Sequence, residues 1–175
     1  MDPDPPAQSP EPKAQSPSPE DLYRTAELAL ASHDPAAADH ALAQLIAIAP
    51  DSPLLDQALY ERARIAYQRH AWAEARRDLD ALVAITRSPL VESGRYLACR
   101  VAVQANDADA ARCLSDYLAA YPSTPHGQDI LALLAQLAFD DHGCDGARVY
   151  VDALAQKYPH AAITGAWRAR CPGAP

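Results

Sequence analysis

The chain has 175 residues, a formal net charge of -8 at pH 7, and 49% apolar residues. This length suits one domain or one short array of repeats. The acidic balance argues against a nucleic-acid-binding protein, because neutralising phosphates requires a basic face. No apolar run approaches the roughly 18 residues that cross a bilayer, so we expect no direct membrane insertion.

The opening residues, MDPDPPAQSP, contain no charged segment followed by an apolar one, as a secretory leader would. Two locations stay open. The chain is either a cytoplasmic protein as written, or a periplasmic or envelope-tethered domain in which Met1 replaces a removed leader.

A proline-rich segment comes first. Residues 1–19 hold seven of the sixteen prolines, and Ala7 and Ala14 are the only apolar side chains after Met1. Such a composition buries too little apolar surface to offset the entropy lost on ordering. We therefore expect residues 1–18 to form a disordered linker or tether.

Signals for the start of a helix recur along the rest of the chain, with a spacing of 36 residues between the last three. Each is a hydroxyl residue followed by proline, and they occur at Ser18-Pro19, Ser52-Pro53, Ser88-Pro89 and Thr124-Pro125. A hydroxyl at the N-cap accepts a hydrogen bond from an unpaired amide, and proline at the first helical position removes another. The pattern therefore predicts a helix that begins at each of these prolines.

Each repeat contains two helices with the same internal spacing. Three residues share one face of the first helix at the i, i+3, i+7 interval, with a small residue in the middle. These trios are Tyr23/Ala26/Leu30, Tyr60/Ala63/Tyr67, Tyr96/Cys99/Val103 and Ala132/Ala135/Phe139. The second helices contain alanines at matching places and end twelve residues later: Ala38 to Pro50, Ala75 to Arg87, Ala110 to Pro122 and Ala147 to Pro159. The units are therefore about 19–51, 52–87, 88–123 and 124–160, and a capping helix follows at 161–170.

A period of this size predicts a solenoid, in which each unit packs on its neighbours. The small, alanine, apolar and proline positions resemble the tetratricopeptide repeat over residues 19–160. In the second unit the pattern falls on Ala63, Ala75, Leu79 and Leu82, whereas Arg87 stands in place of the terminal proline. The resemblance implies an all-α fold, a right-handed superhelix of four helix pairs plus the capping helix.

The resemblance also implies where a partner would bind, because the first helices of such an array line a concave groove. The inward positions hold nine candidate groove residues: Tyr23, Tyr60, Arg64, Tyr67, Gln68, Tyr96, Arg100, Gln104 and Gln136. Tyr and Arg are enriched at interface hot spots. Arg64 and Arg100 would bind a carboxylate, and the groove would hold an extended peptide or a helix of acidic character. The alternative is that the tyrosines pack between units and the arginines are solvated.

The joints at Tyr121–Pro125 and Lys157–Ala161 resemble those of bacterial cell-envelope repeat proteins, of the Tol–Pal coordinator and outer-membrane assembly lipoprotein types. We therefore expect a non-catalytic scaffold or adaptor of the bacterial envelope with a protein or peptide partner. Two alternatives stay open. One is an interaction or sensing domain in sigma-factor or transcriptional control, and the other is a structural accessory subunit of a larger complex.

No pattern of a common catalytic motif occurs, such as H-E-x-x-H, G-x-S-x-G, a P-loop or G-x-G-x-x-G. We therefore expect neither enzymatic activity nor a cofactor. His142 and Cys144 lie beside acidic residues, but a metal site needs three or four converging ligands. A solvated acidic turn is the preferred interpretation, and we expect no metal site.

The four cysteines, at 99, 113, 144 and 171, all lie in the C-terminal half of the chain. Semi-buried thiols are the favoured interpretation, because cysteine is so often buried. Two disulfides are the alternative, with three possible connectivities. In that case Cys144 and Cys171, near the end of the array, would be a possible disulfide, and Cys99 and Cys113 fall on the paired helices of one repeat.

Overall fold

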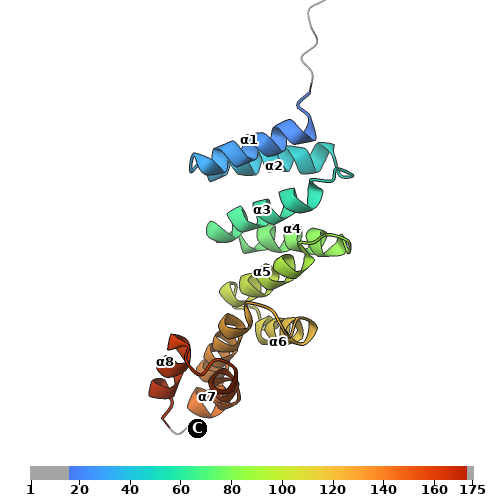
Figure 1. Ribbon diagram of the computed structural model, residues 1–175. Helices are drawn as coiled ribbons and strands as arrows, with labels where there is room; N and C mark the ends of the chain where they lie inside the picture. Colours follow the sequence, from blue (N-terminus) through green and yellow to red (C-terminus); the bar gives the residue numbers. More distant parts are fainter. Residues whose placement is uncertain (1–15, 173–175) are drawn as a thin grey trace, which may run out of the picture. The chain divides into compact units, whose positions relative to one another are not determined.

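The computed structural model describes residues 16–172, and this part of the chain is helical throughout (Figure 1). The described residues form eight helices and no strand, which confirms the predicted all-α class. The chain divides into two compact units, Met1–Leu55 and Asp56–Pro175. Most of the predicted linker, residues 1–15, lies outside the described residues. No helix in residues 16–172 has both the length and the apolarity to cross a membrane.

Unit 1 contains a helical hairpin of α1 (Pro19–Ala31) and α2 (Pro35–Ile48). Ser18 caps α1 as predicted, because its side-chain oxygen accepts a hydrogen bond from the amide of Asp21 at 3.1 Å. Asp34 caps α2 in the same way, through the amide of Ala37 at 3.0 Å. The two helices contact each other and bury mainly small and branched residues: Leu22, Ala26, Ala29, Ala38, Ala41, Leu42 and Leu45.

Unit 2 contains the remaining helices. They are α3 (Leu55–Gln68), α4 (Trp72–Ala84), α5 (Val91–Gln104), α6 (Ala110–Ala120), α7 (Gly127–Lys157) and α8 (Ala162–Arg170). The boundary with unit 1 falls after Leu55, the first residue of α3. Each helix from α4 to α7 contacts the next one along the chain. An ion pair between Arg62 and Asp78 joins α3 to α4.

The core of unit 2 includes two clusters of buried side chains. The first lies among α5, α6 and α7 and contains Cys99, Leu114, Tyr117, Ile130 and Leu134. The second lies along α7 and α8 and contains Leu131, Ala135, Ala147, Val151, Leu154, Trp167 and Cys171. Trp167 is only 5% exposed, so α8 covers the end of the second cluster as a capping helix would.

The turns inside three helix pairs share one backbone motif. His33, His70 and Asn106 have positive φ values of 58°, 60° and 52°. In each turn the amide of the following residue donates to a carbonyl five residues back, at 2.8 to 2.9 Å. This is the Schellman motif, which satisfies carbonyls that the end of a helix leaves unpaired. His and Asn are among the residues that adopt a left-handed conformation more readily than most.

The helices that follow the hydroxyl–proline pairs at 52, 88 and 124 begin later than predicted. The predicted helix starts at 53, 89 and 125 are therefore wrong. At these three sites the carbonyl of the hydroxyl residue accepts from the amide three residues on, at 3.0 to 3.4 Å. The pairs thus form a tight turn before the α-helix begins. The helices start two residues after each proline, at Leu55, Val91 and Gly127.

The second helices end shortly before the predicted stops. Those that precede a proline end two residues before it, at Ile48, Ala120 and Lys157. The residue next to each proline has a ψ of 57° to 68°, outside the helical region. This follows from the clash between proline and a helical preceding residue. The helix that lacks the proline, α4, ends at Ala84, three residues before Arg87.

α7 is two helices joined at a kink at Gly143, within the acidic turn that the sequence predicts around His142 and Cys144. Gly143 has φ 65° and ψ -152°, a conformation that glycine alone adopts readily. Gly146 allows the two halves to approach, because a Cβ atom there would lie 2.5 Å from the carbonyl oxygen of Ala138. The fourth predicted repeat, residues 124–160, therefore contains two helices that approach each other closely at Gly146.

Two disulfides connect the cysteines, contrary to the favoured interpretation of semi-buried thiols. Cys99 of α5 bonds to Cys113 of α6, and Cys144 of α7 bonds to Cys171, which follows α8. Each bond closes a short loop, of 14 and 27 residues in sequence separation. A loop of this size stabilises a fold by about 3 kcal/mol through the lost entropy of the unfolded chain.

Candidate functional site

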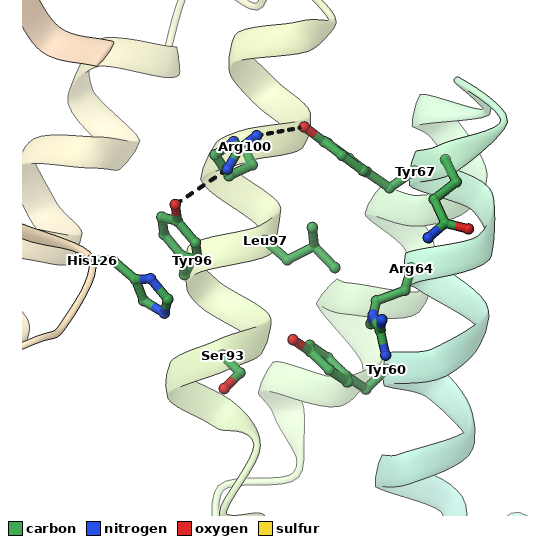
Figure 2. A pocket seen from close by; sticks show the side chains of 9 residues that line it. Tyr60, Arg64, Tyr67, Ser93, Tyr96, Leu97, Arg100 and His126 are labelled. Carbon is green, nitrogen blue, oxygen red and sulfur yellow. Dashed lines mark hydrogen bonds between the residues drawn. The ribbon is translucent and has the colours of Figure 1, made fainter. Parts of the chain in front are cut away.

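The candidate site is a cavity of about 280 Å³ in unit 2 (Figure 2). Its lining comes from α3, from α5 and from the turn that precedes α7. The lining residues are Tyr60, Arg64, Tyr67, Gln68, Ser93, Tyr96, Leu97, Arg100 and His126. α3 and α5 are the first helices of two neighbouring predicted pairs, and the resemblance to the tetratricopeptide repeat implies a groove along such helices.

Arg100 connects the two helices at the cavity. Its guanidinium donates one hydrogen bond to the hydroxyl of Tyr96 at 3.2 Å and another to the hydroxyl of Tyr67 at 3.1 Å. Figure 2 shows these two bonds leaving the guanidinium toward rings on opposite sides. The guanidinium carbon lies 5.8 Å from the centre of the Tyr67 ring and 5.9 Å from that of Tyr96, at the limit of a cation–π contact.

The charge of Arg100 has no acidic partner among residues 16–172. Its Nε atom is buried and makes no hydrogen bond there. Burial opposes the charged form, yet the hydrogen bonds and electrostatic attraction of Tyr96 and Tyr67 outweigh it and raise the pKa of Arg100 above its ordinary value. The cavity thus holds a permanent cation with unused hydrogen-bonding capacity, which is a condition for binding an anion.

The second arginine of the cavity is less available. Arg64 is exposed and forms an ion pair with Glu61 one turn earlier in α3, at 2.8 Å. An exposed pair of this kind contributes little to stability and exchanges readily with water. Arg64 therefore adds a positive charge at the rim, whereas Arg100 supplies the fixed one.

His126 and Tyr96 form a parallel stack, with ring centres 3.8 Å apart and an angle of 5° between planes. A hydrogen-bond network holds the turn that carries His126. The hydroxyl of Tyr117 lies 2.9 Å from that of Thr124 and donates to Glu92 at 3.2 Å. The amide of His126 in turn donates to the hydroxyl of Thr124. The network fixes the wall of the cavity beside Tyr96.

Six of the nine predicted groove residues line this cavity: Tyr60, Arg64, Tyr67, Gln68, Tyr96 and Arg100. The other three lie elsewhere. Tyr23 is half-buried on α1 in unit 1, and Gln104 is exposed at the end of α5. Gln136 accepts a hydrogen bond from Arg170 at 2.7 Å and donates one to Asp140, so it ties α8 to α7.

Three lining residues were missed by the sequence analysis. Ser93 and Leu97 lie one turn from Tyr96 and Arg100 on α5, so the helical period would have placed them on the same face. His126 lies outside the helices, as the residue before α7 begins. No periodic pattern predicts its position, because that depends on how the turn folds back.

No group of three or more His, Cys, Asp or Glu side chains in residues 16–172 is arranged to hold a metal ion. Cys144, which the sequence places beside acidic residues, is bonded to Cys171.

The sequence matches no protein-family model, and a search of curated proteins finds no match either. The cavity and its chemistry are therefore the basis for a functional proposal.

Proposed function

We propose that the protein is a non-catalytic interaction module that binds an extended acidic peptide, or a helix of acidic character, in the cavity between α3 and α5. The observation that carries this proposal is the guanidinium of Arg100, held between the hydroxyls of Tyr67 and Tyr96 with no acidic partner among residues 16–172. A carboxylate of the partner would supply the missing charge. The tyrosine rings would supply flat contact area at a small entropy cost.

We further propose the tetratricopeptide-like architecture that the sequence predicts, a right-handed superhelix of four helix pairs closed by a capping helix. Three features support it. The first helices α1, α3 and α5 are 13, 14 and 14 residues long, the turns at 33, 70 and 106 use the same motif, and a small buried residue occupies the middle of each first helix. Those small residues are Ala26, Ala63, Cys99 and Ala135.

For the biological setting we propose an adaptor of the bacterial envelope. The two disulfides favour this setting, because disulfides persist in oxidising compartments and are rare in the cytosol. A sensing domain of a regulatory system is the second candidate, since the same cavity would serve as its ligand site.

Charge reversal tests the binding proposal. Peptides of twelve residues are first selected from a random library on the wild-type protein. Their affinities are then measured for wild type and for Arg64→Glu combined with Arg100→Glu. A matched control, Arg112→Glu with Arg148→Glu, makes the same change in net charge at exposed positions away from the cavity.

The proposal predicts that the selected peptides are acidic and that the cavity variant binds them at least about tenfold more weakly, the equivalent of 1.4 kcal/mol. The control variant should lose much less, because its charges act only through solvent. Equal losses in both variants would show that net charge, and not the cavity, attracts the peptides.

A further inference from the structure

The chain contains a candidate occupant for this cavity in its own first fifteen residues. Their sequence is MDPDPPAQSPEPKAQ, with five prolines, three acidic residues and one lysine. Two of the acids, Asp4 and Glu11, each stand between two prolines. The proline that follows each of these acids restricts the backbone of the acidic residue to extended conformations, so less entropy is lost when it binds.

The chemistry of this segment matches that of the cavity. Grooves lined by aromatic side chains recognise proline-rich segments, because proline rings pack flat on aromatic ones. In the cavity two tyrosines flank one guanidinium (Figure 2). In the sequence of the segment two prolines flank one carboxylate. A carboxylate of Asp4 or Glu11 on Arg100 would leave the neighbouring proline rings beside Tyr67 and Tyr96.

Size and charge agree with such a short ligand. A cavity of about 280 Å³ lies just below the range of ligand sites, about 300 to 1,000 Å³, which suits a few residues better than a folded surface. The acids of the segment outnumber its single lysine, whereas the cavity presents the cation of Arg100 without an acidic partner among residues 16–172. The net charge of the segment is therefore opposite to that of Arg100, which lines the cavity.

We propose that the proline-rich segment 1–15 is a ligand of the cavity formed by α3 and α5 and competes there with other acidic peptides. The inference rests on the proposed function, because it uses the same cavity. Its consequence is regulatory: a partner has to displace the segment, so the apparent affinity of the protein for that partner is lowered by the fraction of cavities that the segment occupies.

The test uses a synthetic fluorescent peptide of residues 1–15 and three proteins: the full chain, the chain lacking residues 1–15, and that shortened chain with Arg100→Met. The shortened chain keeps every described helix. Binding is followed by fluorescence anisotropy. A second peptide, in which Asp4→Asn and Glu11→Gln remove the carboxylates and keep the prolines, is the matched control.

We expect the peptide to bind the shortened chain. It should bind about tenfold more weakly to the Arg100→Met variant and to the full chain. The control peptide with neutralised acids should also bind the shortened chain about tenfold more weakly. Binding that ignores Arg100, or an absence of binding to the shortened chain, would overturn the inference. Circular dichroism of the Arg100→Met variant checks that it folds. If library peptides still bind the cavity while the segment does not, only this inference fails and the proposed function stands.

Discussion

The ion pair between Arg62 and Asp78 gives a quantitative test of how α3 is held. Asp78 is 2% exposed and accepts two hydrogen bonds from the Arg62 guanidinium, each 2.6 Å long. The guanidinium of Arg77 lies 3.5 Å from the same carboxylate. A buried carboxylate is costly unless it is paired, and here the bidentate geometry compensates for the lost hydration.

Asp78→Asn removes the charge and keeps the size of the side chain. The guanidinium of Arg62, whose side chain is 15% exposed, would then face a neutral amide. Breaking a buried pair in this way costs about 3 to 5 kcal/mol. We expect the lower value of about 3 kcal/mol, because the amide oxygen still accepts one hydrogen bond.

The assay is urea unfolding without reductant, followed by circular dichroism. Asp80→Asn is the matched control on the same helix, because Asp80 is 68% exposed and lies 3.7 Å from Arg76. Its substitution should change the free energy of unfolding by less than about 0.5 kcal/mol. A loss below about 1 kcal/mol for Asp78→Asn, or one equal to that of the control, would refute the view that this pair fixes α3 on α4.

Two further predictions concern the backbone and the alkaline limit of stability. Gly143→Ala should destabilise the protein by about 1 to 2 kcal/mol in the same unfolding assay, because its φ of 65° is strained for alanine while space around it is free. Gly165→Ala on α8 has equally free space without that φ and should be neutral or stabilising, so equal losses would contradict this explanation. Burial, reinforced by the charge of Glu92, raises the pKa of Tyr117 despite an opposing hydrogen bond from Thr124. The folded state therefore keeps a proton that the unfolded chain releases above pH about 10, so stability falls as pH rises through that region, and Tyr117→Phe should flatten the fall in a pH series of melts.

The helices were predictable because they repeat. Small and apolar residues recur at fixed intervals, and the same period placed Tyr60, Tyr67 and Tyr96 on helix faces that line the cavity. Arg64, Gln68 and Arg100 were expected there only from the resemblance to the tetratricopeptide repeat. Spacing and resemblance together predicted six of the nine lining residues.

Features that depend on contacts between separate elements were not predicted. The helical period places Asp78 on the buried face of α4 with Ala75, Leu79 and Leu82, where a carboxylate is unexpected. Only the position of Arg62 on the other helix explains how its charge is accommodated there. The same holds for His126, which reaches Tyr96 from a turn. The turns after Ser52, Ser88 and Thr124 shifted three helix starts for a local reason, since a tight turn competed with the first turn of the helix.

The pairing of a ligand carboxylate with Arg100 is the central claim, and a double-mutant cycle measures it most directly. One library-selected acidic peptide is prepared with each acid and with the corresponding amide, and each form is titrated against wild type and Arg100→Met. For one of the acids we predict a coupling of at least about 1.5 kcal/mol, as found for close charge pairs in protein interfaces. Additive effects at every acid, within about 0.3 kcal/mol, would contradict the claim that Arg100 binds a carboxylate.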